Sequence, residues 1–421
     1  MSEQPHVVVL GAGFAGLGAI KKLHKANVRI TLLDKNDYHT FQPLLYQVAT
    51  AELAPSEISF PLRDLLHKHP NLTFHQTQAE SIDLAGRQVH AAGIPPLAYD
   101  YLVVAPGAVV NYFDTPGAQE HALPLYTMED ALRLKAHILT TLETIDKQPT
   151  LIDSGALNFC IVGGGPTGVE VAGALIELLQ SEFKQDYPNL PIDRAQVLLY
   201  EHSPHLLGPF LPELRAYAEK TLRERGVGVH TGTGVSKISA TGIELSNGEQ
   251  MPTRTLIWAA GLQANPIVQS LGVPLAHGGR VPVGADLQLA GHPGVFAIGD
   301  IAAMADGKTG ALLPGLGAVA LQAGHHVGDS IRRLIDGKTV EPFAYFDKGT
   351  MATVGRSAAV AQLPLGITLT GLPAWLAWLG VHLTLLSTDA ERNSVFVDWG
   401  WNLLTKQRSK RTLLGDNIPQ G

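Results

Sequence analysis

The sequence predicts an α/β protein with two Rossmann-like domains and a C-terminal helical region of different character. Two glycine-rich motifs, beginning at Gly11 and Gly163, each follow a short apolar run and precede a helix-like segment. Four of the five tryptophans lie within the last fifty residues, beside long apolar stretches. Strand, glycine turn and helix are the core of a Rossmann unit, so the duplicated motif carries the prediction of two such domains.

The first glycine motif has all the parts of a dinucleotide-binding turn. The apolar run Val7–Leu10 leads into Gly11, Gly13 and Gly16, and a second apolar run ends at Asp34. In such a turn the first glycine permits the tight bend, the second lets backbone approach a pyrophosphate, and the third lets the helix pack on the strand. The pyrophosphate lies on free N–H groups at the helix N-terminus, and the acid accepts hydrogen bonds from the ribose. We therefore expect an adenine dinucleotide here; the alternative is a glycine-rich turn in another βαβ fold.

Composition excludes several classes of function. The 421 residues suffice for two or three domains, and the net charge of -7 argues against a nucleic-acid partner. Cys160 is the single cysteine, so the chain cannot form an internal disulfide, a dithiol redox pair or a cysteine zinc cluster. It lies in an apolar run and is expected to be a buried core thiol. The 17 histidines show no ligand spacing, so no metal site is predicted, and the start of the chain leaves no room for a signal peptide.

The second glycine motif repeats the first, with Gly163, Gly165 and Gly168 between an apolar run and a helix-like segment. The next predicted strand ends at Glu201, further from the glycines than usual, because a polar, proline-bearing stretch at 181–193 intervenes and is interpreted as a surface insertion. A carboxylate at this position repels a 2′-phosphate, which favours NADH over NADPH. The alternative is that Glu201 only caps its strand.

The remaining elements complete the two units. Buried strands that end in glycine or an acid are predicted at 99–108, 255–261 and 295–300, helices at 128–142 and 311–335, and a hairpin turn at Asn247-Gly248. The set suggests one tightly held flavin nucleotide, completed by Asp300, and one exchanging nicotinamide on the second unit. Because one cysteine cannot relay electrons as a dithiol, the acceptor must reach the flavin itself. It is therefore a quinone, oxygen or a small redox protein.

The C-terminal region has the pattern of helices that lie in a membrane interface. Residues 372–386 are nearly all apolar, but these 15 residues fall short of the about 20 that span a bilayer. Residues 395–404 carry Phe396, Trp399 and Leu403 at helical spacing. Four basic residues follow: Lys406, Arg408, Lys410 and Arg411. Tryptophan and basic residues beside an apolar face are typical of helices drawn to anionic headgroups; a dimerisation surface or a core helix is the alternative.

Over nearly its whole length the sequence resembles the type II NADH:quinone oxidoreductases. These are single-subunit, non-pumping NADH dehydrogenases of the two-dinucleotide-binding-domain flavoprotein superfamily, with a glutathione-reductase-like fold. The resemblance lies in the segments 38–50, 163–170 and 347–356 and in the tryptophan-rich tail. The glycine motifs alone indicate the superfamily, whereas the first and third segments point to the family.

The resemblance implies tightly bound, non-covalent FAD, NADH as substrate and a quinone, menaquinone or ubiquinone, as acceptor. FAD is implied at Gly11, Gly13, Gly16, Asp34, Gly107 and Asp300, and NADH at Gly163, Gly165, Gly168 and Glu201. Further cofactor contacts are implied at Gln42, Pro43, Gln47, Gly299 and Gln322, with Gln47 at the lip of the quinone pocket. The implied catalytic residues are Glu170, where nicotinamide meets flavin, Gln322, beside the isoalloxazine, and Lys348, near the same pocket. Glu170 or Lys348 would supply protons to the quinol.

The resemblance also implies an organisation and a location. An FAD-binding domain is expected at 1–113 and 280–345, an NADH-binding domain at 114–279, and a C-terminal membrane-associating region at 346–421. A homodimer is expected, attached as a peripheral, monotopic protein to the cytoplasmic face of the cell membrane.

Two departures from the family pattern are visible. Gly317 and Ala318 stand where the family usually has an alanine-glutamine pair, so one polar contact to the quinone head is missing. The link at 387–391 is more acidic than the family's arginine-bearing one. The main rival interpretation is a soluble NADH-dependent flavin reductase that passes electrons to oxygen or a small redox protein. A second is a redox-dependent binding protein similar to apoptosis-inducing factor, for which the sequence offers no basic surface; sulfide:quinone oxidoreductases and disulfide reductases need paired cysteines.

Overall fold

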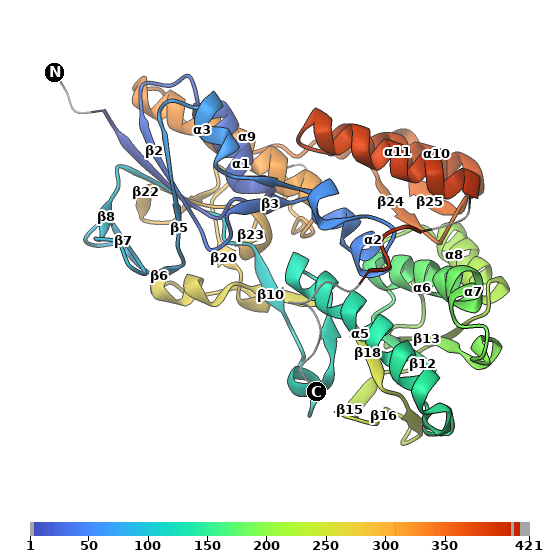
Figure 1. Cartoon of the computed structure of the whole chain (residues 1–421). Helices are drawn as coiled ribbons and strands as arrows, with labels where there is room; N and C mark the ends of the chain where they lie inside the picture. The colour runs from blue at the N-terminus through green and yellow to red at the C-terminus, as the bar shows by residue number, and fades with distance from the viewer. Residues whose placement is uncertain (1–3, 308, 406–407, 413–421) are drawn as a thin grey trace. The chain divides into compact units, whose positions relative to one another are not determined.

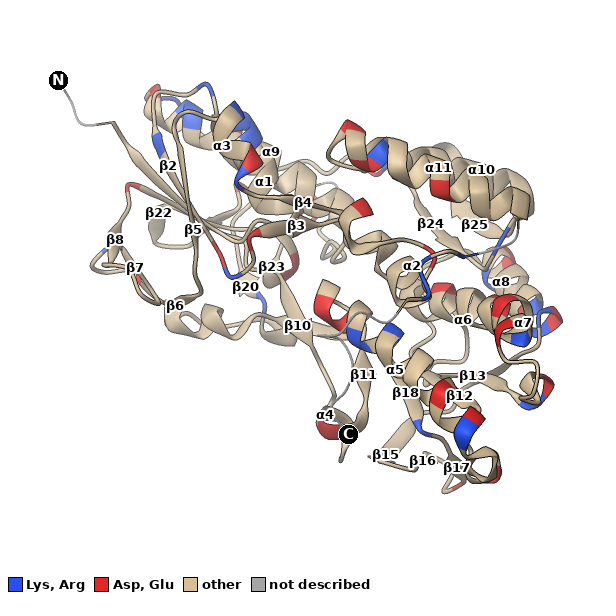
Figure 2. Cartoon of the chain, viewed as in Figure 1, with Lys and Arg blue, Asp and Glu red and all other residues tan. Residues whose placement is uncertain are grey.

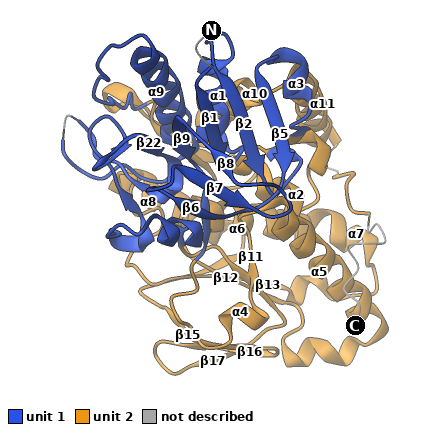
Figure 3. Cartoon of the chain, turned by 90° about the vertical axis from the view of Figure 1, so that its left-hand side faces the viewer, with its two compact units in different colours: residues 1–39, 60–110, 262–347 blue, residues 40–59, 111–261, 348–421 orange. Residues whose placement is uncertain are grey.

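The computed structural model describes residues 4–307, 309–405 and 408–412, and the chain divides into two compact units (Figure 3). Unit 1 comprises residues 1–39, 60–110 and 262–347, and unit 2 comprises residues 40–59, 111–261 and 348–421. By this division, residues 40–59, 111–113, 262–279 and the C-terminal region group differently from the predicted domains. Residues 262–279 belong to unit 1, because β19 (Leu262–Ala264) pairs with β10 (Ala108–Val110), whereas residues 40–59 and the C-terminal region belong to unit 2.

Unit 1 is organised around a six-stranded sheet with the order β21-β22-β9-β1-β2-β5, of which β22, β9, β1, β2 and β5 are labelled in Figure 3. The strands are β21 (Gln288–Leu289), β22 (His292–Ala297), β9 (Tyr101–Val104), β1 (His6–Leu10), β2 (Arg29–Asp34) and β5 (Leu72–Gln76). All are parallel except β21. Every residue of β1 is buried, as expected for a central parallel strand that is covered on both faces.

Helices α1 (Phe14–Leu23) and α9 (Gly317–Ile335) of unit 1 cross at backbone contact. A Cβ atom at Gly324 would overlap the Ala15 carbonyl, and one at Gly18 would lie 2.9 Å from the Leu321 oxygen. Glycine at these two positions therefore permits the crossing. The other elements of this part of the chain are β3 (Tyr38–Thr40), β4 (Ser59–Pro61), α3 (Asp64–Lys68), β6 (Ala79–Asp83), β7 (Gln88–Ala91), β8 (Leu97–Ala98), β20 (Val281–Pro282), β23 (Ala302–Ala303), and the 3-10 turns η6 (Pro266–Leu271), η7 (His277–Gly279) and η8 (Gly299–Ile301).

Unit 2 contains the second parallel sheet, with the order β11-β18-β12-β13-β14. Its strands are β11 (Leu123–Pro124), β18 (Thr255–Trp258), β12 (Asn158–Val162), β13 (Gln196–Glu201) and β14 (Val227–Thr231). Helix α6 (Pro166–Leu178) connects β12 to β13, so the predicted second βαβ unit is confirmed. The predicted hairpin at Asn247-Gly248 joins β16 (Gly242–Leu245) to β17 (Gln250–Pro252), beside β15 (Val235–Ser239).

The C-terminal part of unit 2 comprises a small antiparallel sheet and two helices. Strands β24 (Thr350–Thr353), β25 (Ala359–Gln362) and β26 (Thr368–Thr370) pair in order, and α10 (Gly371–Leu385) packs on them next to α11 (Asp389–Thr405) (Figure 1). Within the described ranges, no helix combines the length and the apolar character needed to cross a membrane. The remaining elements of unit 2 are η1 (Gln42–Leu44), α2 (Leu45–Ala49), η2 (Pro55–Glu57), α4 (Ala118–His121), α5 (Met128–Lys147), η3 (Pro149–Ser154), the π-helical turn η4 (Leu179–Phe183), α7 (Lys184–Asp186), η5 (Ile192–Arg194), α8 (Pro212–Glu224) and η9 (Pro364–Gly366).

Three interpretations of local sequence were wrong. The tail tryptophans, interpreted as part of a membrane interface, are mostly interior residues, because Trp375, Trp378 and Trp399 are buried and Trp401 alone among the four is exposed. Phe396 and Leu403, predicted on one face with Trp399, are indeed exposed. The stretch 181–193 is not wholly a surface insertion, since Glu182 and Phe183 are buried in η4, and residues 311–316 precede α9 instead of belonging to it.

Candidate functional site

The glycine turn of unit 1 has the shape that a bound dinucleotide requires. Gly11 has a φ of +94°, and a Cβ atom there would overlap the Ala105 carbonyl at the end of β9. A Cβ atom at Gly16 would overlap the Gly11 carbonyl, so this glycine lets α1 pack against the turn. Gly13 has no atom within 4 Å of its Cβ position. The middle glycine therefore leaves the open surface that a pyrophosphate can approach.

Asp34, at the end of β2, is already bound to this turn. Its Oδ2 accepts the Ala12 N–H at 2.7 Å, and its Oδ1 accepts the Asn36 N–H at 2.8 Å. Burial raises the pKa of Asp34, and the two backbone amides oppose the shift. Gly107 and Asp300 follow β9 and β22, whose carboxyl ends lie at the same edge of the parallel sheet. This edge is where open α/β sheets bind ligands.

The glycine turn of unit 2 repeats this geometry position by position. Gly163 has a φ of +108° and its Cβ position lies 2.6 Å from the Ala259 oxygen, while a Cβ atom at Gly168 would overlap the Gly163 carbonyl. Gly165, like Gly13, has nothing within 4 Å. The two turns therefore offer the same open middle position.

Glu201, at the end of β13, occupies the same position relative to the second glycine turn as Asp34 occupies relative to the first. Its Oε2 accepts the Gly164 N–H at 2.6 Å and its Oε1 accepts the Ser203 N–H at 2.6 Å. The carboxylate thus connects the strand end to the glycine turn, and its role toward a ribose stays a prediction.

Glu170 lies on the second turn of α6. Its Oε1 accepts the Thr353 N–H from the end of β24 at 3.3 Å. Burial raises the pKa of Glu170 to about 8, and the Thr353 amide acts in the opposite direction. Glu170 is therefore largely protonated at neutral pH and can donate a proton.

A line of polar side chains leads away from Thr353 to α11. The Tyr46 hydroxyl lies 3.0 Å from Thr353 Oγ1, Gln47 Nε2 donates to the Tyr46 hydroxyl at 3.2 Å, and Trp399 Nε1 donates to Gln47 Oε1 at 2.9 Å. Burial raises the pKa of Tyr46, and Glu170 and Glu52 raise it further when they are ionised. Gln47 is 4% exposed and lies in the interior of unit 2; its place at the lip of the quinone pocket stays a prediction.

A small cavity of about 30 Å³ adjoins these side chains within unit 2. Its lining includes Tyr46, Glu52, Asn402 and Arg408. Asn402 Nδ2 and Arg408 Nε are buried without a hydrogen-bond acceptor in the described part of the chain, and the cavity has room for about two water molecules that can satisfy them. Burial raises the pKa of Glu52, although the Arg408 charge opposes it. Sequence reasoning missed this cluster, whose members come from distant segments.

Gln322 is hydrogen-bonded to the backbone, whereas Lys348 is exposed. The Gln322 amide exchanges two hydrogen bonds of 3.0 Å with the Phe346 backbone, and thereby fixes the chain shortly before Lys348. Gln42 donates from Nε2 to the Tyr126 carbonyl at 3.3 Å. A Cβ atom at Gly317 would lie 3.1 Å from the Phe14 ring, so glycine at this position avoids a close contact with that ring.

The predicted site residues divide between the two units. Unit 1 contains Gly11, Gly13, Gly16, Asp34, Gly107, Gly299, Asp300 and Gln322. Unit 2 contains Gln42, Pro43, Gln47, Gly163, Gly165, Gly168, Glu170, Glu201 and Lys348. Among the described residues, no cluster of three or more histidine, cysteine or acidic side chains could hold a metal ion.

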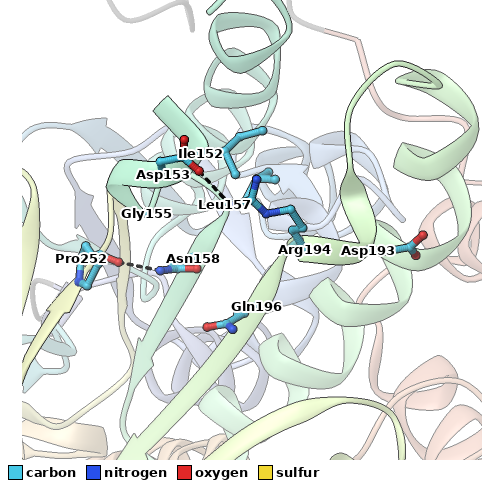
Figure 4. Close-up of a pocket in the computed structure, with 10 residues that line it drawn as sticks. Ile152, Asp153, Gly155, Leu157, Asn158, Asp193, Arg194, Gln196 and Pro252 are labelled. Atoms are coloured by element: carbon cyan, nitrogen blue, oxygen red, sulfur yellow. Dashed lines mark hydrogen bonds and ion pairs between the residues drawn. The ribbon is translucent and has the colours of Figure 1, made fainter. Parts of the chain in front are cut away.

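A larger hollow of about 430 Å³ lies at the other edge of the unit 2 sheet (Figure 4). Asn158 and Gln196, at the amino ends of β12 and β13, line it. Asn158 donates to the Pro252 carbonyl at 2.8 Å, and Arg194 pairs with Asp153 at 2.9 Å (Figure 4). Because the glycine turn is at the carboxyl ends of these strands, this hollow is not the nucleotide site.

Comparison with family models matches the chain twice. Residues 5–324 match the pyridine nucleotide-disulphide oxidoreductase family, and residues 348–406 match the NDH2 C-terminal domain. A type II NADH:quinone oxidoreductase of Mycobacterium tuberculosis is 34% identical over 97% of this chain and 90% of its own length. A demethylphylloquinone reductase of Synechocystis is 30% identical over 94% of this chain and 96% of its own length.

Solved structures show the same fold. NDH2 from Plasmodium falciparum, in complex with NADH, superimposes with a TM-score of 0.90 and 20% identity, and the match covers 98% of this chain and 100% of that one. The sulfide:quinone oxidoreductase of Aquifex aeolicus superimposes with a TM-score of 0.74 and 21% identity over 96% of each chain. At these identities the likeness concerns the fold alone.

Proposed function

Because the chain belongs to the type II NADH:quinone oxidoreductases, we propose that it oxidises NADH through tightly bound FAD and reduces a membrane quinone without pumping protons. The observation that carries the proposal is the pair of glycine turns, each with an open middle glycine and a carboxylate on the turn amide. Two equivalent nucleotide sites suit one resident and one exchanging dinucleotide.

The residues of unit 1 fit an FAD molecule. Gly13 offers open backbone for the pyrophosphate, and the Asp34 carboxylate stands where ribose hydroxyls can donate to it. The residues that would hold the cofactor are Gly11, Gly13, Gly16, Asp34, Gly107 and Asp300. The chemistry that FAD supplies when bound is acceptance of a hydride and release of two electrons to quinone. The second turn, with Gly165 and Glu201, would hold NADH.

Protonation of the quinol is the chemistry that this chain's own side chains provide. The carboxyl group of Glu170 carries a proton at neutral pH and loses this proton as the pH rises through about 8. Lys348 is the second proposed donor. We further propose a homodimer at the cytoplasmic face of the cell membrane, with menaquinone or ubiquinone as acceptor.

An anaerobic experiment tests the overall function. NADH is expected to bleach the flavin absorbance of the purified holoenzyme, and a short-chain quinone is expected to restore it within seconds, faster than air does. Bleaching without recovery by quinone would favour the soluble flavin reductase. No bleaching at all would contradict the NADH assignment.

Replacing Glu201 with glutamine is expected to raise KM for NADH about tenfold, because a charged acceptor of the ribose hydroxyls is lost. The discrimination against NADPH is expected to weaken as well, since the repelling charge is gone. Steady-state kinetics with both nucleotides measure the two effects. Glu224→Gln, an exposed substitution on α8, is the control. An unchanged KM in Glu201→Gln would support the strand-cap interpretation instead.

The proposed membrane surface is the outward side of α10 and α11. Helix α10 carries no charged residue (Figure 2). The exposed apolar residues of the two helices are Leu372, Leu376, Val381, Leu385, Phe396, Val397, Trp401, Leu403 and Leu404. An apolar surface on helices that do not span a bilayer suits a lipid interface.

The basic residues after α11 do not add to this surface. Arg408 is 2% exposed and pairs with Glu177 and Glu182, Lys410 Nζ lies 3.0 Å from Asp398, and Arg411 Nε lies 2.7 Å from Asp186. For Arg408, which is buried, the interpretation that it is drawn to anionic headgroups was wrong. Lys410 and Arg411 are paired with acids of unit 2, which weakens any attraction between these two side chains and anionic headgroups. Lys406 lies outside the described residues.

Binding to lipid vesicles is accordingly expected to be equal for zwitterionic and anionic bilayers and insensitive to salt. Co-sedimentation at low and high ionic strength measures it. Serine at Phe396 and Leu404 together is expected to release the protein, since both side chains are exposed and apolar. Release by salt, or a requirement for anionic lipid, would contradict the prediction.

A further inference from the structure

Two acids on one face of α6 hold the turn that follows β24. Glu170 and Glu177 are seven residues apart, which places them on the same side of the helix. The Thr353 N–H donates to Glu170 Oε1 at 3.3 Å, and the Arg356 N–H donates to Glu177 Oε1 at 2.6 Å. The segment 353–356 is thus attached to α6 at both of its ends.

Between these two bonds the turn lies directly on the helix backbone. A Cβ atom at Gly173, midway between the acids, would lie 2.8 Å from Gly355 N and 2.8 Å from Val354 C. Gly355 has a φ of +104°, and its own Cβ position lies 2.6 Å from Glu177 Oε1. The backbone of residues 353–356 is in direct contact with the backbone of α6 at Gly173. A shift at the Arg356 end of the turn is therefore expected to move the Thr353 end as well.

Glu177 is the centre of a charged cluster that fixes this arrangement. Arg225, at the end of α8, donates from Nη1 to Glu177 Oε1 and from Nη2 to the Arg356 carbonyl at 2.6 Å. Arg408 Nη2 donates to Glu177 Oε2 at 3.4 Å. Hydrogen bonds to a charged acceptor are stronger than neutral ones, so the cluster depends on the charge of Glu177.

We propose that Glu177 is a positioning residue for quinone reduction, because by holding the 353–356 turn it keeps the Thr353 amide on the Glu170 carboxyl. The inference rests on the proposed function of Glu170 as proton donor. The Thr353 N–H favours the charged form of Glu170, so a displaced turn leaves burial unopposed and raises the pKa of Glu170.

The charged and titratable groups around the turn come from several elements. They are Tyr46 of α2, Glu52 after α2, Glu182 of η4, Arg225 after α8, Arg356 of the turn and Arg408. Burial and the Thr353 amide are the two influences on the pKa of Glu170. The pH response of Glu170 therefore depends on where the Thr353 amide lies.

The substitution Glu177→Gln in the FAD-loaded enzyme tests the inference. In this variant, the pH at which quinone turnover declines is expected to be about half a unit higher than in the wild type, and KM for NADH is expected to be unchanged. The protonated-carboxyl infrared band that Glu170→Gln removes is expected to titrate with the same shift in the resting enzyme. Glu213→Gln, exposed on α8 and away from the turn, is the matched control and is expected to shift neither.

The outcomes distinguish the positioning role of Glu177 from the proton-donor role of Glu170 on which it rests. If Glu170→Gln leaves both the alkaline decline and the infrared band in place, the proton-donor role of Glu170 fails. If it removes them while Glu177→Gln leaves both at the wild-type pH, the positioning inference alone is overturned. Should Glu177→Gln yield no folded enzyme, Arg225→Met, which releases the Arg356 carbonyl, is expected to give the same shift, and an unshifted profile in that variant overturns the inference.

Discussion

Replacing Glu170 with glutamine is expected to slow quinone turnover about a hundredfold, the lower range of what a positioned proton donor contributes. Glutamine has the same size and can still accept the Thr353 N–H, so the structure around it is retained. It carries no ionisable proton, and the turnover that remains is expected to lose its decline as the pH rises through about 8. Stopped-flow measurement of the two half-reactions is expected to place the loss in the reoxidation by quinone.

A second substitution tells whether Glu170 acts alone. Lys348→Met removes the other proposed donor, which is exposed and follows the segment fixed by Gln322. If Glu170→Gln and Lys348→Met both keep full turnover from acidic to mildly alkaline pH, neither side chain supplies the proton. A loss in Lys348→Met alone would transfer the role to the lysine.

Replacing Arg408 with methionine is expected to destabilise the protein by about 3–5 kcal/mol, the typical cost of removing one partner from a buried ion pair. The change leaves Glu182, itself 3% exposed, without its cation, and removes the donor that lies 3.0 Å from the Thr50 carbonyl. Thermal unfolding of the intact enzyme is expected to show a midpoint lower by roughly 5 °C.

Arg411→Met is the matched control for this substitution. Arg411 pairs with Asp186, but the two side chains are 26% and 38% exposed, and a pair of that kind contributes less than about 1 kcal/mol. Equal midpoints for the Arg408 and Arg411 variants would contradict a structural role of the buried guanidinium.

Local patterns predicted the parts of the fold that depend on near neighbours in sequence. The roles of Gly11 and Gly163 follow from a strand, a turn and a helix within about twenty residues, and the structure places both glycines at tight turns with positive φ. Cys160 was predicted to be a core thiol, and it is fully buried, with its pKa raised to about 12 by burial. The assignment of FAD and NADH to the two turns stays a prediction.

Long-range contacts explain what the sequence could not reveal. The tail pattern predicted helices correctly, but the buried position of Trp399 depends on Gln47, 352 residues earlier. Polarity made Glu182 look like a surface residue, and its partner Arg408 is 226 residues away. Periodicity along one segment carries no information about such partners. The spacing of Glu170 and Glu177 on α6 was the one visible signal of the charged cluster.

The backbone contact at Gly173 has a consequence for protein engineering. The C-terminal sheet meets α6 through a position that admits no side chain, flanked by acids that hold main-chain amides. A C-terminal segment taken from a homologue will therefore pack correctly only with that homologue's own α6. The alternative is a host α6 that has a glycine and two acids at the positions of Gly173, Glu170 and Glu177. In chimeric enzymes, helix α6 and the C-terminal segment must therefore be exchanged together, even though about 180 residues of sequence separate them.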